Sequence, residues 1–158
     1  MAIVASGMCH HQSVRVVLDT NILVSACWKP DGLEAQVVDL AMTGQITACV
    51  SSHILAEYRD VLSRRKLASV TARAQELLAA LERIALSVEA TTQITASIDD
   101  DDNRFLECAT AAGADYVITG NLRHYPAELA VPHGTIRIVN ARTFLTEALP
   151  HTLSKQSR

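Results

Sequence analysis

The stretch SIDDDDNRFLECATAAGADYVITGN, Ser97 to Asn121, places four consecutive aspartates directly before a helical pattern and an apolar run. Asp102 to Ala112 has apolar residues at helical spacing, and Gly113 is a typical helix stop. The run from Asp115 to Thr119 predicts a strand that is covered on both faces. Four adjacent carboxylates repel one another unless water screens them or a cation lies among them. The aspartates therefore form either a solvated loop or part of a metal site.

The rest of the chain also alternates strand and helix patterns. β-Branched and apolar runs predict strands at Val14 to Leu18, Ile46 to Val50 and Ile136 to Val139. Helical spacing predicts helices at Leu33 to Thr43, from a cap at Ser51 or Ser52 to Arg65, at Thr71 to Leu86, and from a cap at Asn140 to Leu149. Gln93 to Ile98 is interpreted as a strand or as an extended lead into the aspartates. The alternation predicts an α/β fold with helices on both faces of a parallel sheet.

The composition indicates one globular domain. The chain has 158 residues, of which 49% are hydrophobic and 20% charged, so it can bury a sizeable core. No apolar run reaches the roughly 18 residues that a membrane span needs, and the start lacks the basic and apolar regions of a signal peptide. We therefore expect a cytoplasmic protein with no membrane partner. Residues 1–13 are expected to be a flexible lead-in, residues 14–149 the domain and residues 150–158 a polar tail.

The charge balance does not exclude a nucleic-acid substrate. The formal net charge is −3, whereas nucleic-acid binders are usually basic. A metal site made of carboxylates, however, adds negative charge to the sequence. Once divalent ions are bound, the local charge of the binding face is reversed. The four cysteines show no paired spacing, so structural zinc is not expected, although Cys9-His10-His11 could bind a stray metal ion.

Acidic residues follow or precede the predicted strands at points that should meet. Asp19 directly follows the first strand, and Thr119 to Asn121 end the strand of the quoted stretch. Asp102 opens the helix that leads into that strand, and Glu57 lies in the first two turns of the helix after the second strand. Sites of open α/β sheets form at the carboxyl ends of the strands. We therefore expect Asp19, Glu57 and Asp102 to converge at this edge.

Converging carboxylates predict a site for a hard cation. Mg²⁺ and Mn²⁺ prefer carboxylate and water oxygens, and such an ion can polarise a phosphodiester and activate a water. The chain has no obvious serine–histidine pair and no phosphate-binding glycine loop of the Walker type. Simpler interpretations remain open for each residue: Asp19 as a turn residue, Glu57 as a solvated helix flank and Asp102 as a helix cap.

Four segments carry a resemblance to a known family. They are RVVLDTNILVSA (Arg15 to Ala26), SSHILAEYRDVLSRRKL (Ser51 to Leu67), DDDDNRFLECATAAGADYVITGN (Asp99 to Asn121) and IRIVNARTFL (Ile136 to Leu145). With these segments the chain resembles PIN-domain proteins of the VapC-like type, the ribonuclease toxins of toxin–antitoxin pairs. The resemblance runs from about Val14 to Leu149 and implies a three-layer α/β/α sandwich with a central parallel sheet.

The resemblance also implies an activity, a cofactor and partners. It implies an endoribonuclease that depends on Mg²⁺ or Mn²⁺, with RNA as substrate, a cognate antitoxin protein as partner and a homodimer as assembly. By motif, Asp19, Glu57 and Asp102 match the catalytic acidic ligands. Thr119 matches the small hydroxyl residue at the strand end, and Asn21 a polar support beside Asp19.

One position departs from the family pattern. Many members have an acid in the loop where this chain has Asn121. Asn121 can coordinate a metal through its carbonyl oxygen or hold a water, and Asp101 can compensate as a neighbour of Asp102. Two interpretations follow: an active metal-dependent ribonuclease, or a PIN-like module that binds RNA or protein with weakened or absent nuclease activity. An aspartate-based phosphoryl-transfer or receiver domain ranks last, because no lysine lies near Thr119.

Basic residues near this edge are candidates for RNA contacts. They are Arg59, Arg64 and Arg65, with Lys66 beside them, and Arg104, Arg123 and His124 near the expected ligands. The stretch Arg64-Arg65-Lys66 could equally be a solvated helix end that satisfies the helix dipole. Aromatic residues are only 4% of the chain, so base stacking is a poor candidate for binding. Recognition is expected to use phosphate contacts and RNA shape.

Overall fold

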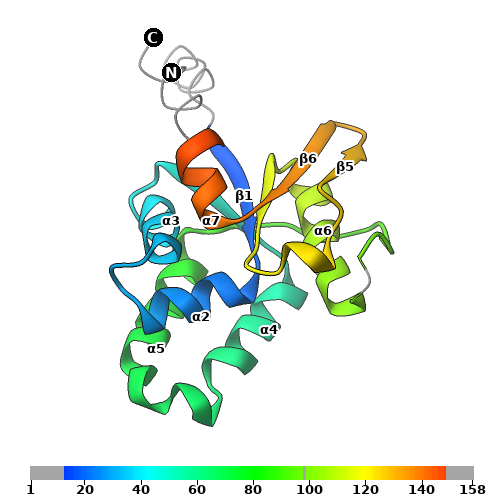
Figure 1. The fold of residues 1–158 in the computed structure, drawn as a ribbon. Coiled ribbons are helices and arrows are strands. Elements are labelled where there is room, and N and C mark those ends of the chain that lie inside the picture. The colour runs from blue at the N-terminus through cyan, green and yellow to red at the C-terminus, as the bar shows by residue number, and fades with distance from the viewer. Residues whose placement is uncertain (1–12, 98, 149–158) are drawn as a thin grey trace, which may run out of the picture.

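The structure, a computed structural model, describes residues 13–97 and 99–148, which form a sheet of six strands and its covering helices (Figure 1). The strands are β1 (Val14–Leu18), β2 (Ile46–Val50), β3 (Leu86–Ser87), β4 (Tyr116–Ile118), β5 (Glu128–Val131) and β6 (Gly134–Val139). Their order is β3-β2-β1-β4-β6-β5, and β5 is the one strand that pairs antiparallel among these residues. The predicted parallel sheet is confirmed, with an antiparallel strand added at one edge.

Helices lie on both sides of this sheet. They are α2 (Thr20–Trp28), α3 (Leu33–Met42), α4 (Ser52–Leu62), α5 (Thr71–Ile84), α6 (Asp100–Ala112) and α7 (Ala141–Thr143), with 3₁₀ turns η1 (Arg65–Val70) and η2 (Leu122–His124). α6 packs against β1, β2 and β4, and α3 contacts β2 and α7. Figure 1 shows α3 and α7 on the opposite side of β1 from α6. The fold is therefore the expected three-layer α/β/α sandwich.

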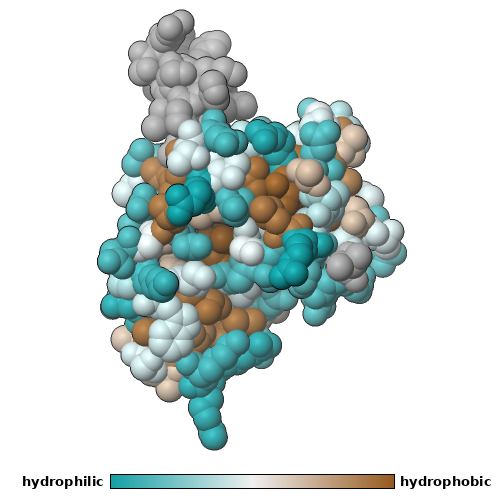
Figure 2. All heavy atoms as spheres, in the orientation of Figure 1, coloured by the Kyte–Doolittle hydropathy of each residue, from teal (hydrophilic) through white to brown (hydrophobic). Residues whose placement is uncertain are grey.

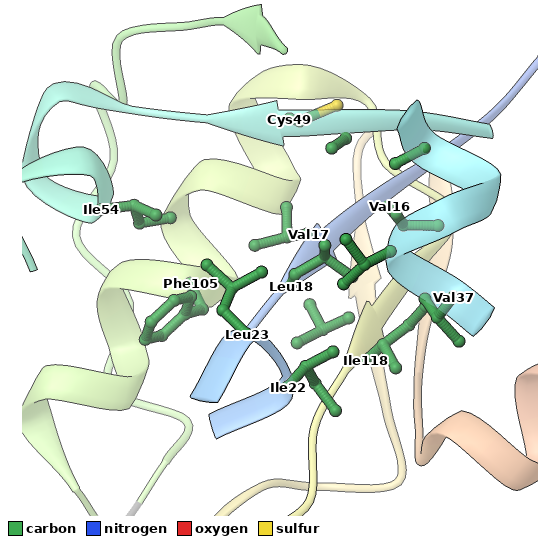
Figure 3. Packing of buried hydrophobic residues seen from close by; sticks show 14 of the residues in the cluster. Val16, Val17, Leu18, Ile22, Leu23, Val37, Cys49, Ile54, Phe105 and Ile118 are labelled. Atoms are coloured by element: carbon green, nitrogen blue, oxygen red, sulfur yellow. The ribbon is translucent and has the colours of Figure 1, made fainter. Parts of the chain in front are cut away.

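The central strand β1 is buried because apolar side chains meet it from both layers. Val16, Val17 and Leu18 have at most 1% of their surface exposed. Figure 3 shows Phe105 of α6 on one side of this strand and Val37 of α3 on the other. The apolar run from Val16 to Leu18 fits the part of the strand that is covered on both faces, while Arg15 near its start is exposed.

The helix ends follow local capping chemistry. The Ser51 hydroxyl accepts the Ile54 N–H at 3.2 Å, so Ser51 and not Ser52 caps α4. Asp99 caps α6 by accepting the Asp101 N–H at 3.0 Å, so the interpretation of Asp102 as the cap is wrong. Gly113 ends α6 with φ +63°, a conformation that favours glycine. The Asn140 side chain accepts the Thr143 N–H at 2.8 Å, which confirms the predicted cap.

Other boundaries differ from the predictions. The helix expected to reach Arg65 ends at Leu62, and the one expected to reach Leu86 ends at Ile84 and leads into β3. The segment 93–97 is not a strand. Side chains of α6 satisfy its backbone instead, because Asn103 Oδ1 accepts the Ser97 N–H at 2.7 Å and Glu107 Oε2 accepts the Ile94 N–H at 3.1 Å. The segment therefore leads into α6 and is held in place by hydrogen bonds to side chains of that helix.

Polar side chains cover much of the face seen in Figure 2, with apolar patches between them. Within the described ranges, the large hydrophobic residues that are exposed are Trp28, Ile84 and Leu122. A membrane crossing would need a longer and more apolar helix than any found in residues 13–97 and 99–148. Of the expected lead-in at residues 1–13, residues 1–12 lie outside the described residues, and so does the expected tail at 150–158.

Candidate active site

The pairing of β1 with β4 brings Asp19 and Thr119 together. Leu18 and Ile118 are register partners in these parallel strands, so the residues that follow them emerge side by side. The Asp19 N–H donates to the Ile118 carbonyl at 2.9 Å, and Thr119 Oγ1 donates to Asp19 Oδ2 at 2.8 Å. The strand ends thus fix the first of the predicted acidic residues at the carboxyl edge of the sheet.

Asp19 is a buried carboxylate held by two hydroxyl groups. Its exposed fraction is 5%, and its Oδ2 accepts from Tyr125 Oη at 3.1 Å as well as from Thr119. Burial raises the pKa of Asp19, and the hydroxyls of Thr119 and Tyr125 oppose that rise. Burial and the charges of Asp19 and Asp102 raise the pKa of Tyr125, so its phenol remains a proton donor. Both hydroxyls reach the same carboxylate oxygen.

Glu57 joins the cluster from α4, where it is half-buried. The Thr20 hydroxyl, at the first residue of α2, donates a hydrogen bond to its carboxylate. Burial is the largest cause that raises the pKa of Glu57, and the charges of Asp19, Asp101 and Asp102 raise it further. These carboxylates therefore lie close enough to repel one another, and their charged forms are favoured by a cation among them.

Asp102 lies in the first turn of α6 and faces η2. Burial and the Asp19 charge raise the pKa of Asp102. Its Oδ2 lies 3.0 Å from Nδ1 of His124. Single donor atoms of Asp99, Asp102 and His124 all lie within 4.8 Å of one another, a spacing suited to a metal ion. His124, expected from the sequence to contact RNA, thus belongs to the acidic cluster.

A cleft of about 670 Å³ opens between α2, α4 and the start of α6. Three of the predicted metal-site acids line it, namely Glu57, Asp101 and Asp102. Of the predicted support residues, Asn21 also lines it, and its Oδ1 accepts the Gly120 N–H at 2.9 Å.

Asn121 is placed differently from the acids. Its side chain is exposed, and its backbone N–H donates to Thr119 Oγ1 at 3.0 Å. Asn121 does not line the main cleft. The structure therefore brings it to the correct edge of the sheet, next to Thr119 but outside the cleft.

The predicted RNA-binding side chains divide into two groups. Arg64 and Arg104 line the cleft together with Lys66. Arg64 pairs with Asp60 at 2.8 Å, and Arg104 pairs with Glu107 at 2.5 Å and Asp100 at 3.1 Å. The others lie outside the cleft lining: Arg59, paired with Glu82 of α5 at 3.0 Å, and the exposed Arg65 and Arg123.

Sequence reasoning missed three residues of the site. Thr20 directly follows Asp19, and Asp99 lies two residues before Asp101, so closeness in the chain was the signal available for them. Tyr125 is 106 residues from Asp19, and no spacing rule connects the two. The turn η2, which directly precedes Tyr125, brings its hydroxyl to Asp19.

The chain is similar to known proteins in both sequence and fold. A family model described as a PIN domain matches residues 15–123, which is more than half of the chain. The uncharacterized protein MJ1680 of Methanocaldococcus jannaschii is 26% identical over 142 residues, covering 85% of this chain and 91% of that protein.

Two solved structures share the fold. The crystal structure of VapBC2 from Rickettsia felis bound to a promoter DNA fragment has a TM-score of 0.52, 18% identity, and coverage of 79% of this chain and 98% of that one. The crystal structure of DNA-bound VapBC from Salmonella typhimurium has a TM-score of 0.53, 18% identity, and coverage of 81% and 98%. From the match to its family model over most of its length, the chain belongs to the PIN domain family.

Proposed function

We propose that this PIN-domain chain is a metal-dependent endoribonuclease and the toxin of a toxin–antitoxin pair. The observation that carries the proposal is the coupling of three carboxylates, Asp19, Glu57 and Asp102. Burial raises the pKa values of all three, and the charge of Asp19 raises those of Glu57 and Asp102 further. Perturbed pKa values cluster at functional sites, which supports a functional role for these acids.

The donor chemistry fits Mg²⁺ or Mn²⁺. Hard divalent cations prefer carboxylate oxygens, and Asp19, Glu57, Asp101 and Asp102 supply them at one edge of the sheet. Asn121 can add a carbonyl oxygen from the neighbouring loop. A bound ion would polarise the scissile phosphate and activate a water for attack. We assign Asp19, Glu57 and Asp102 as the residues that hold it.

The chain's own residues hold these ligands in place. Thr119 and Tyr125 orient Asp19 through Oδ2, and Thr20 orients Glu57. Such partners reduce the freedom of a ligand and so reduce the cost of binding an ion. Asn21 fixes the backbone at Gly120 and thereby supports the strand end that carries Thr119.

RNA is the proposed substrate, and the cleft offers cations for its phosphates. Arg64 and Lys66 lie at the same cleft as Glu57 and Asp102, so a strand whose phosphate reaches the acids can place neighbouring phosphates near these side chains. Arg104 is held by Glu107 and is a weaker candidate. Arg59, Arg65 and Arg123 would serve only an RNA that extends beyond the cleft, and His124 one that reaches η2.

The partner and assembly rest on the named neighbours. Both solved structures are VapBC complexes, in which a PIN-like chain is accompanied by a second protein. By analogy we propose a cognate antitoxin for this chain, a homodimer as its assembly and the cytoplasm as its location. The fold likeness supports this proposal at low identity, so co-purification with the product of a neighbouring gene is its direct test.

A specific observation favours a second function. Asn121 is neutral where the resemblance to the family implies an acid, and it lies outside the cleft lining. With less negative charge the site would hold its ion more weakly, and the chain could bind RNA or a protein without cleaving. Incubation of the purified protein with mixed RNAs, with Mg²⁺ or Mn²⁺ against a chelator, separates the two functions. Cleavage that stops on chelation supports the nuclease, and RNA binding without cleavage supports the binding module.

A further inference from the structure

The imidazole of His124 lies next to the acidic cluster, in the same loop as the neutral Asn121. His124 Nδ1 is 3.0 Å from Asp102 Oδ2, and a carboxylate oxygen of Asp99 completes a set whose atoms lie within 4.8 Å of one another. Two ligands at about 2.1 Å from an octahedral ion lie about 3 Å apart when adjacent and about 4.2 Å apart when opposite. The 3.0 Å between His124 Nδ1 and Asp102 Oδ2 fits two adjacent ligands of one ion, and Asp99 offers a carboxylate oxygen within 4.8 Å of both atoms.

The backbones of His124 and Asp99 are both hydrogen-bonded to the side chain of Ser97. The Ser97 hydroxyl donates to the His124 carbonyl and accepts the Asp99 N–H at 3.2 Å. Ser97 is itself held by Asn103, which is 2% exposed and whose Oδ1 accepts the Ser97 N–H at 2.7 Å. The loop that carries His124 and the cap of α6 are therefore fixed relative to one another, as a preorganised ligand set requires.

We propose that His124 is a direct metal ligand that acts with Asp99 and Asp102, and that its imidazole makes the site prefer a transition-metal ion such as Co²⁺ over Mg²⁺. The inference depends on the proposed function in one respect, because both assign Asp102 as a metal ligand. Imidazole nitrogen suits later divalent transition metals, whereas Mg²⁺ favours oxygen and gains little from it. His124 thus supplies the ligand that an acid at position 121 would otherwise provide.

The competing role for His124 is that of a hydrogen-bond partner that only orients Asp102. The two roles differ in metal selectivity. Loss of a nitrogen ligand lowers the affinity for a transition-metal ion and leaves the Mg²⁺ affinity nearly unchanged. Loss of a contact that only orients Asp102 lowers both affinities alike, because both ions need Asp102. Asn at position 124 can still bond to Asp102 through its amide but offers no imidazole, so His124→Asn is the decisive variant.

The experiment titrates the full-length parent and His124→Asn with Co²⁺ and with Mg²⁺ by calorimetry. We expect the parent to bind Co²⁺ more tightly than Mg²⁺. In His124→Asn the Co²⁺ affinity should fall by about tenfold or more, with Mg²⁺ affinity changed less than about twofold. The NMR spectrum of the Co²⁺-loaded parent should show a strongly shifted imidazole N–H signal that His124→Asn lacks.

Matched controls address the other histidines that could bind Co²⁺. His53→Asn removes a histidine that lines the cleft, and a double change of His10 and His11 to Asn removes the segment suspected of stray binding. Both variants should keep the shifted signal. Equal loss of Co²⁺ and Mg²⁺ affinity in His124→Asn, or a signal that disappears in a control variant instead, overturns the inference. These readouts do not depend on RNA cleavage, so failure of the nuclease proposal is seen separately.

Discussion

Tyr125 Oη donates a hydrogen bond to Asp19 Oδ2 at 3.1 Å, which ties the loop after η2 to the end of the central strand. Thr119 binds the same oxygen at 2.8 Å, and all three residues are buried. The contact fixes the rotamer of the acid that lies deepest in the cluster. Tyr125 is therefore a positioning residue for the proposed metal site.

Tyr125→Phe should weaken metal binding more than it weakens the fold. Loss of the hydroxyl removes one of the two hydroxyl donors that favour the charged form of Asp19, so the pKa of Asp19 should rise further. We expect about tenfold weaker Mn²⁺ binding by calorimetry and a loss of about 1 kcal/mol in the free energy of unfolding in urea. Tyr116→Phe is the matched control, because Tyr116 packs edge-on against Phe144 away from the acids. Equal effects of the two changes on metal affinity would contradict the assigned role.

Divalent metal should stabilise the folded protein. Mg²⁺ or Mn²⁺ binds the assembled carboxylates and not the unfolded chain, so an ion at 100 times its Kd should add about 2.7 kcal/mol to the free energy of unfolding. The melting temperature in millimolar metal, compared with that in chelator, measures this effect. Asp102→Asn should reduce the shift. An unchanged melting temperature in the parent would count against a working site.

Without metal, stability should fall as pH rises above the ordinary carboxylate range. The folded-state pKa values of Asp19, Glu57 and Asp102 are raised, so the folded protein binds more protons than the unfolded chain just above pH 4. The contribution of these groups is therefore greatest below their unfolded pKa values and is lost as pH rises through the folded ones. Urea unfolding in chelator at about pH 4 and about pH 7 should show a smaller decrease for Asp19→Asn than for the parent. The same decrease in both proteins would refute this assignment.

Asn121→Asp should tighten metal binding. The change adds a carboxylate to the loop beside Thr119, and each added charge strengthens attraction to a divalent ion. Calorimetry should show an increase of several-fold in Mg²⁺ affinity, and the cleavage rate at low Mg²⁺ should rise with it. Asn21→Asp is not an equivalent control, because Asn21 Oδ1 is occupied by the Gly120 N–H. Unchanged Mg²⁺ affinity would show that position 121 lies too far from the ion to matter.

Much of the fold follows from sequence patterns that are strong by themselves. The segment Val16 to Leu18 is apolar because both faces of β1 are covered there, and the parallel register then places Asp19 beside Thr119. The helix TNILVSACW was not predicted, because it is apolar on several sides and shows no clean period. The hairpin β5–β6 was missed because β5 is a half-exposed edge strand with a weak alternation.

The finer structure of the site depends on tertiary contacts that no local pattern encodes. His124 meets Asp102, and Tyr125 meets Asp19, only because η2 returns the chain toward α6 and β1. Likewise, the segment 93–97 has no strand partner, since Asn103 and Glu107 of α6 satisfy its backbone. The sequence identified the acids from their places relative to the predicted strands and helices, whereas the residues that orient them could be found only from the packing.

Cleavage of RNA by Asp19→Asn tests the central claim most directly. Asn preserves the size of the side chain but removes the charge that would hold a hard cation, so the rate should fall by about a hundredfold or more. Metal-free stability should hold or rise, since one repelling charge is gone. Asp39→Asn, an exposed change on α3, is the matched control and should cleave as the parent does. The rate is measured on mixed RNAs with Mg²⁺ or Mn²⁺ in nuclease-free preparations. Loss of cleavage in Asp19→Asn alone is the predicted result, and cleavage as fast as that of the parent would contradict the metal-nuclease account.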